Sequence, residues 1–246
     1  MYKIIALIPA RYAATRFPGK LMKVLEGKTI IRRTYEAVNS TQLFNDVIVV
    51  CDHEIIFNEI ISFGGKAIMS RNQHESGTDR IAEVAQDLDA DIFVNVQGDE
   101  PFIASSSLQK LISLFTNNDV EVGSLILPIH DIQKIENPNC VKVVVDKQKR
   151  AMYFSRSPIP YFREKGIPQS AYQHIGVYAF RKQVLLNFTK LPVSELEYIE
   201  KLENLRLLEN GIPIHLAEIE QIGISIDTEE DFEMAKSYMK LQNKQD

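Results

Sequence analysis

Residues 4–20, IIALIPARYAATRFPGK, decide the fold. Ile4–Ile8 is an unbroken apolar run, which is typical of a β-strand that is covered on both faces. The segment after it carries Arg11, Arg16 and Lys20, and Pro18-Gly19-Lys20 predicts a turn. In open α/β sheets, ligands bind outside the carboxyl ends of the strands. Cations gathered there predict a loop that holds a triphosphate, although a solvated loop with three scattered cations is the alternative interpretation.

Strand-like and helix-like segments alternate through the first half of the chain. Strands are predicted at 4–8, 47–51, 66–69, 92–96 and 122–128, and helices at 29–40, 54–63, 78–88 and 105–115. This alternation predicts βαβ units and therefore an α/β fold with a Rossmann-like, mostly parallel sheet.

The pattern changes after about residue 130. Strand candidates at 141–146, 151–155 and 173–180 have no long helix between them, which predicts a small antiparallel-rich subdomain, and residues 157–171 predict a loop. Ser194 and Glu197 form a capping box for one helix that we expect to run to Asn210 and to end at Gly211. Residues 228–243 predict the last helix. We expect a single domain over residues 1–246.

Composition narrows the class of partner. The 246 residues hold 28 Lys and Arg against 33 Asp and Glu, so the net charge is −5. Nucleic-acid binders are usually basic, so no nucleic-acid partner is expected, and a local basic cluster in an acidic chain points to a small anionic ligand. No signal peptide and no apolar stretch of about 20 residues is present, which predicts a cytoplasmic protein with no membrane partner. Cys51 and Cys140 are expected to be buried free thiols.

Several common site motifs are absent. Gly27-Lys28-Thr29 matches the end of a phosphate-binding P-loop, but Met22 stands where that loop needs its first glycine. The first strand is not followed by the G-x-G-x-x-G of dinucleotide-binding dehydrogenases, and no Cys and His cluster suggests zinc.

Two carboxylates stand at predicted strand ends. Asp99 follows the strand at 92–96 and comes after Gly98, which we expect to permit a sharp turn. Asp227 is expected to end a short strand and to begin the last helix. Magnesium prefers few protein carboxylates together with phosphate oxygens, so the pair predicts a shared magnesium site. A turn aspartate and a helix N-cap are the alternative interpretations.

Eight segments resemble, in the same order, those of the 3-deoxy-manno-octulosonate cytidylyltransferases, the CMP-Kdo synthetase family. They are IPARYAATRFPGK (8–20), RNQHESGTDR (71–80), NVQGDEPF (95–102), VKVVVD (141–146), YFSRSPIP (153–160), QHIGVYAF (173–180), ELEYIEKLENLRLLENG (195–211) and GISIDTEED (223–231). The resemblance runs over roughly residues 3–240 and is highly specific.

The resemblance implies a fold and an activity. The fold is that of the nucleotide-diphospho-sugar transferases, with a nucleotide-binding half at 1–130 and a sugar-binding half at 131–246 that also contributes to a homodimer. The implied reaction transfers CMP from CTP to 3-deoxy-D-manno-octulosonate (Kdo) with Mg²⁺, and it releases pyrophosphate. The product CMP-Kdo serves lipopolysaccharide core synthesis.

The resemblance also implies roles for individual residues. The catalytic residues are Arg11, Lys20, Asp99 and Asp227, of which Asp99 and Asp227 hold the metal. The CTP-binding residues are Arg11, Arg16, Lys20, Asp52, Gln73, Ser76 and Arg80. The Kdo-binding residues are Gln97, Arg156, His174, Tyr178, Glu203 and Asn204. Lys20 is expected on an exposed loop, so that its removal lowers activity and leaves thermal stability nearly unchanged.

The residue patterns by themselves leave alternatives open. His174 is equally typical of a buried edge histidine, Arg156 of a surface ion pair, and Glu203 of a solvent-facing helix residue. Ala14 stands where the family commonly has serine, and Asn204 stands where it has glutamine. The alternative substrates are therefore 8-amino-Kdo and a sialic acid, although a sister group that uses 8-amino-Kdo tends to have glutamine in place of Glu100. A silent sugar-nucleotide binding module is the rival outside the enzymes.

Overall fold

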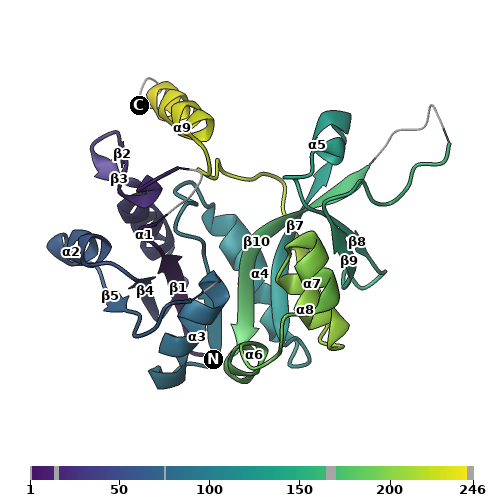
Figure 1. Cartoon of the computed structure of the whole chain (residues 1–246), viewed down its shortest axis with the longest axis horizontal. Helices are drawn as coiled ribbons and strands as arrows, with labels where there is room; N and C mark the ends of the chain where they lie inside the picture. Colours follow the sequence, from purple (N-terminus) through teal and green to yellow (C-terminus); the bar gives the residue numbers. More distant parts are fainter. Residues whose placement is uncertain (1, 14–16, 75, 165–169, 243–246) are drawn as a thin grey trace. The chain divides into compact units, whose positions relative to one another are not determined.

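The structure, a computed structural model, describes residues 2–13, 17–74, 76–164 and 170–242 (Figure 1). It forms two compact units. Unit 1 comprises Met1–Ser105 and Ile222–Asp246, and unit 2 comprises Ser106–Gln221. This division differs from the predicted halves at 1–130 and 131–246, which were defined by what each half binds and stay a prediction.

A four-stranded parallel sheet forms the centre of unit 1. Its order is β5 (Ala67–Met69), β4 (Asp46–Cys51), β1 (Ile4–Ala10) and β6 (Ile92–Asn95). Every residue of β1 is buried, because β4 and β6 flank it and helices pack beside it. The prediction of a mostly parallel sheet is confirmed for this unit.

The helices of unit 1 follow the predicted pattern closely. They are α1 (Ile30–Ser40), α2 (Glu54–Ser62), α3 (Gly77–Asp87) and α9 (Glu229–Gln242), with the short elements η1 (Lys20–Met22), β2 (Val24–Leu25) and β3 (Lys28–Thr29). Side-chain oxygens of Thr29 and Ser76 cap α1 and α3 by accepting backbone N–H bonds. The last helix, α9, returns to β2 near the start of the chain (Figure 1).

Unit 2 contains the antiparallel strands. β10 (Ala171–Arg181) pairs antiparallel with β7 (Val122–Ile129) and with β8 (Lys142–Val145). β8 also pairs antiparallel with β9 (Ala151–Ser155), whereas β11 (Ile214–Glu218) runs parallel to β7. The predicted antiparallel-rich subdomain is confirmed. The remaining elements are α4 (Ser105–Ser113), η2 (Leu114–Thr116), α5 (Ile132–Glu136), α6 (Lys182–Phe188), α7 (Glu195–Glu200) and α8 (Asn204–Glu209).

The single helix expected at 195–210 is wrong, because α7 and α8 are separate. Lys201 adopts a left-handed conformation with φ 53° and ends α7. The Arg156 guanidinium donates to the carbonyl oxygens of Glu200 (2.8 Å) and Lys201 (3.4 Å), which takes up acceptors that a continuous helix would use. A buried bidentate pair between Arg206 and Glu197, at 2.5 and 2.7 Å, joins the two short helices.

Of the two local expectations around the predicted metal carboxylates, the one for Asp227 is wrong and the one for Gly98 is confirmed. Asp227 neither ends a strand nor caps α9, because residues 221–227 have no regular structure and the cap is made by Thr228 and Asp231. The sharp turn expected at Gly98 is confirmed, because residues 98 and 99 form a turn in which the N–H of Glu100 donates to the carbonyl oxygen of Gln97 at 3.2 Å. Gly98 makes this turn without a left-handed backbone. A Cβ at Gly98 would instead lie 3.1 Å from the carbonyl oxygen of Pro9, so close packing against β1 favours glycine there.

In the part of the chain that the structure describes, no helix combines the length and the apolar character needed to cross a membrane.

Candidate active site

Lys20 lies between the two carboxylates that the sequence analysis selected as metal ligands. Gly19 has φ 65° and precedes η1, so the turn predicted at Pro18-Gly19-Lys20 is confirmed and places Lys20 first in η1. The Nζ atom of Lys20 lies 2.5 Å from Oδ2 of Asp99 and 2.8 Å from Oδ1 of Asp227. Its side chain is only 15% exposed, so the expectation of an exposed loop lysine is wrong.

Backbone contacts bring the two aspartates together. Asp99 follows β6, and its carbonyl oxygen accepts a 3.0 Å hydrogen bond from the N–H of Ile226. Gly223 stands three residues before Ile226, and a Cβ at Gly223 would lie 2.3 Å from the carbonyl oxygen of Phe102. Only glycine therefore allows the segment before Asp227 to approach the segment after Asp99 so closely. The carboxylate of Asp227 therefore reaches the site from a segment held directly against the turn that carries Asp99.

The charges of Asp99 and Asp227 stabilise the protonated form of Lys20. Burial by itself would lower the pKa of the Lys20 ammonium, but the Asp99 charge and hydrogen bonds with both aspartates raise that pKa above its usual value. Burial and the neighbouring Asp99 charge raise the pKa of Glu100 to about 8. Glu100 therefore favours its neutral form at pH 7, and Asp99 and Asp227 supply the negative charge that faces the cation.

Two adjoining clefts in unit 1 collect the residues predicted to bind CTP. Arg11, His74 and Arg80 line both clefts. Asp52 and Gln73 line the larger cleft, and Ser76 lines the smaller one together with Gln97, which the resemblance assigned to the sugar. The structure thus brings together every described residue of the predicted CTP set except Lys20, which lies with the aspartates. Arg16, like Ala14, lies outside the described residues.

Hydrogen bonds fix the wall of the larger cleft. Arg80 is 4% exposed, and its guanidinium donates to Oδ2 of Asp52 and to Oγ of Ser70, both at 3.1 Å. The other carboxylate oxygen of Asp52 accepts the N–H of Tyr12 at 2.9 Å. The ring of Tyr12 stacks on His53 with centroids 4.4 Å apart. The first loop and the carboxyl end of β4 are therefore tied to α3.

Sequence reasoning did not single out Tyr12, His53 or His74 at these clefts. Two signals were available. Tyr12 and His74 stand inside segments that resemble the family, and His53 directly follows the predicted ligand Asp52. What the sequence does not show is the stacking of Tyr12 on His53, since the two residues lie in separate loops.

The predicted Kdo-binding residues other than Gln97 belong to unit 2. His174 and Tyr178 lie on β10 with ring centroids 5.3 Å apart, and Nε2 of His174 lies 3.1 Å from Oγ of Ser124. Burial lowers the pKa of His174 to about 3, so its ring is neutral. Burial and then the charge of Glu203 raise the pKa of Tyr178. Glu203 is only partly exposed, so the solvent-facing alternative for it is wrong.

Asn204 and Arg156 differ in how their side chains are used. Asn204 is 3% exposed, and within the described residues its Nδ2 atom finds no hydrogen-bond partner. Arg156 donates to three backbone carbonyls, those of Pro138, Glu200 and Lys201, so the surface ion pair considered for it is wrong. The amide of Asn204 is thus a buried donor with no partner among the described residues, whereas the guanidinium of Arg156 holds two loops together.

Comparison with known proteins places the chain among the nucleotidyltransferases, because a cytidylyltransferase family model matches residues 5–222. The 3-deoxy-manno-octulosonate cytidylyltransferase of Flavobacterium johnsoniae is 56% identical over 97% of this chain and 99% of its own. The enzyme of the same name from Christiangramia forsetii is 50% identical over 96% of this chain and 97% of its own.

A solved structure agrees with these relatives. The CMP:2-keto-3-deoxy-manno-octonic acid synthetase complexed with CTP superposes with a TM-score of 0.93 at 39% identity, and the alignment covers 98% of this chain and 99% of that one. The chain therefore belongs to the 3-deoxy-manno-octulosonate cytidylyltransferase family. The nucleotide-diphospho-sugar transferase-like fold and the nucleotidyltransferase class inferred from the motifs are both confirmed.

Proposed function

We propose that the protein transfers CMP from CTP to Kdo, giving pyrophosphate and CMP-Kdo for lipopolysaccharide core synthesis. The convergence of Asp99 and Asp227 on one cation carries the proposal, since a silent binding module has no need of such a charged centre. The names of the Flavobacterium and Christiangramia relatives and of the solved synthetase support CTP and Kdo as the substrates.

The proposal includes magnesium, held by Asp99 and Asp227. The donor set fits this ion, because magnesium takes one or two carboxylates together with substrate phosphate oxygens. The two aspartates already converge on the single positive charge of Lys20. In the described part of the chain no group of three or more His, Cys, Asp or Glu residues offers a different metal site. When bound, magnesium would supply charge neutralisation at the phosphates.

The remaining chemistry asks the protein for position and charge. The anomeric hydroxyl of Kdo attacks the α-phosphorus of CTP, and pyrophosphate leaves in line with it. Arg11 lines both nucleotide clefts and would hold the triphosphate. Lys20 would exchange its carboxylate contacts for the negative charge that grows on pyrophosphate, which is how a positioned cation lowers such a barrier.

For the sugar, we propose binding residues in unit 2. The neutral His174 and the buried amide of Asn204 offer hydrogen-bond partners for hydroxyl groups. Arg156 was predicted to bind the sugar carboxylate. Its guanidinium still has N–H groups beyond the three that bond to carbonyls, so a contact with the carboxylate is compatible with its structural contacts.

The proposal has a direct test in pyrophosphate release from CTP and Kdo with magnesium. We expect release that requires all three components and that falls sharply when 8-amino-Kdo or a sialic acid replaces Kdo. Preference for one of those sugars would change the substrate and keep the enzyme class. CTP binding without pyrophosphate release from any of the sugars would instead establish the binding module.

We further propose a cytoplasmic homodimer in which unit 2 contributes to the contacts. Met152, Tyr198 and Ile199 of this unit are about two thirds exposed, and a partner subunit would cover them. Sedimentation velocity at micromolar concentration should give a dimer, and a monomer under these conditions would contradict the proposal.

A further inference from the structure

We propose that Glu83 is a positioning residue for CTP, acting through the loop 70–74. The inference rests on the proposed function in one respect, because it takes the clefts beside this loop as the nucleotide site. The glutamate belongs to α3, one turn after Arg80, and it does not itself line either cleft. It would therefore act on the nucleotide only through the residues that it holds.

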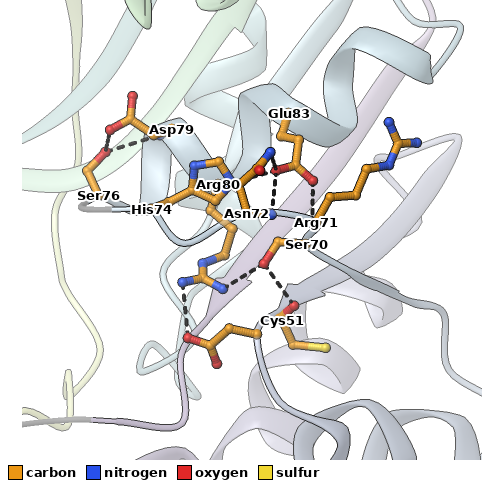
Figure 2. A network of polar contacts seen from close by, with 10 residues as sticks. Cys51, Ser70, Arg71, Asn72, His74, Ser76, Asp79, Arg80 and Glu83 are labelled. Atoms are coloured by element: carbon orange, nitrogen blue, oxygen red, sulfur yellow. Dashed lines mark hydrogen bonds and ion pairs between the residues drawn. The ribbon is translucent and has the colours of Figure 1, made fainter.

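The carboxylate of Glu83 accepts four hydrogen bonds from three positions of the loop, 71, 72 and 74 (Figure 2). Oε1 accepts the N–H of Arg71 at 2.6 Å. Oε2 accepts both the N–H of Asn72 at 3.2 Å and its side-chain Nδ2 at 3.0 Å. Oε2 also lies 2.7 Å from Nε2 of His74. One side chain thus satisfies backbone and side-chain donors that have no regular secondary structure to pair with.

Glu83 accepts these hydrogen bonds as a largely buried, ionised carboxylate. The side chains of Glu83 and His74 are 13% and 14% exposed. Burial by itself would raise the pKa of Glu83, but the hydrogen bonds from Arg71, His74 and Asn72 lower it below its usual value. The residue is therefore ionised at neutral pH, when hydrogen bonds to a charged acceptor are strongest.

The loop that Glu83 holds lines the larger of the two clefts taken as the nucleotide site. Gln73 and His74 line the larger cleft together with Arg11, and they lie within or next to the segment that Glu83 anchors. Arg80 fixes the beginning of the same loop through Ser70. Helix α3 therefore fixes the loop at both ends, with a cation at Ser70 and an anion at 71–74. Without Glu83, Gln73 and His74 would lose their fixed positions at the cleft.

The chain supplies a matched control on the same helix. Asp87 lies one turn after Glu83 and also pairs with Arg71, at 2.7 Å from its Nη2. That pair is exposed, with 75% of the Arg71 side chain and 56% of the Asp87 side chain accessible, and it involves no backbone donor. Exposed ion pairs contribute little, so removing Asp87 should not affect the loop.

The test compares Glu83→Ala, Glu83→Gln and Asp87→Asn with the wild type. For Glu83→Ala we expect the Kd and KM for CTP to rise on the order of 10-fold, because hydrogen bonds to a charged group are lost. The KM for Kdo should stay within about twofold of the wild-type value, because the sugar residues other than Gln97 lie in unit 2. Glu83→Gln should be intermediate, since its amide keeps one acceptor oxygen. Asp87→Asn should match the wild type.

Hydrogen exchange without any substrate gives a readout that does not depend on activity. The amides of Arg71 and Asn72 should exchange faster in Glu83→Ala, while the amides of α3 keep their protection. A CTP Kd within twofold of wild type, or equal increases in both KM values, would overturn the proposal. If Glu83→Ala does not fold, Glu83→Gln decides, and failure of both to fold also counts against it. A wild type that neither binds CTP nor releases pyrophosphate would instead refute the proposed function.

Discussion

Replacing His174 by a residue that does not titrate should make the free energy of unfolding fall less steeply as the pH drops below 6.5. The half-buried ring packs against Phe154 and Tyr178, with centroids 4.9 and 5.3 Å away. Burial lowers its pKa from 6.5 to about 3, because the imidazolium form would lie in an apolar interior. The unfolded chain exposes the same ring to water, where its pKa returns to about 6.5.

The sign and size of the effect follow from these two pKa values. Between pH 6.5 and pH 3 the unfolded chain binds a proton that the folded protein does not bind, so acid favours unfolding. The free energy of unfolding should fall by about 1.4 kcal/mol for each pH unit below 6.5. Between pH 7 and pH 5 the loss due to His174 is about 2 kcal/mol.

The assay is urea denaturation of wild type and His174→Gln at pH 7, 6 and 5, followed by a probe in unit 2. Glutamine is chosen because its amide can reach Ser124 Oγ as Nε2 does, without a group that titrates in this range. The variant should lack about 2 kcal/mol of the wild-type loss between pH 7 and pH 5. His130→Gln, which changes an exposed side chain, serves as the control and should behave as wild type does.

Histidine ring signals in NMR give the direct check. The His174 ring should remain neutral down to at least pH 4.5 in the folded protein. A midpoint above pH 5.5, or identical acid losses in wild type and His174→Gln, would refute the reasoning from burial.

Three further predictions concern the charged residues. Asp99→Asn or Asp227→Asn should lower kcat by about 10²-fold or more with the fold intact. Near-wild-type, magnesium-dependent turnover in both variants would show that the two aspartates are not the metal ligands. Lys20→Ala should lower kcat/KM for CTP by roughly 10²-fold. It should also destabilise the substrate-free protein by roughly 1–3 kcal/mol, because Asp99 and Asp227 then lack the cation between them. Calorimetry should find that magnesium restores part of this lost stability, and an unchanged melting temperature would contradict the prediction. Arg156→Ala should raise KM for Kdo more than KM for CTP. It should also lower the melting temperature, because three backbone carbonyls lose their donor. A lower melting temperature with both KM values unchanged would mean that Arg156 has only a structural role.

The sequence predicts the fold well wherever structure is local. The buried strands 4–8, 47–51 and 92–96 and the helices between them were found from apolar runs, helical spacing and caps, and they match β1, β4, β6 and α1–α3 closely. The short helices α5 and α6 were not predicted, since five and seven residues carry too little helical periodicity to stand out. The strand β11 was not predicted because its sequence, IHLAE, has no unbroken apolar run.

Where prediction failed, a distant side chain had overridden a correct local signal. The capping box at Ser194 and the stop at Gly211 were identified correctly, but the helix between them breaks at Lys201. The cause is Arg156, which lies more than 40 residues earlier and takes the carbonyls at the break. No pattern within 195–210 shows that contact.

The site has the same division between local and distant information. Residue types and expected strand ends made Asp99, Asp227 and Lys20 candidates for phosphate and metal chemistry, with alternatives open, and the family resemblance supplied their roles. They were not enough to show that Lys20 contacts both aspartates across 79 and 207 residues of chain. That contact changes the meaning of the opening loop. An acidic chain tolerates cations after its first strand partly because one of them neutralises its own carboxylates. We propose that the same cation becomes available to phosphate when those carboxylates take a metal ion.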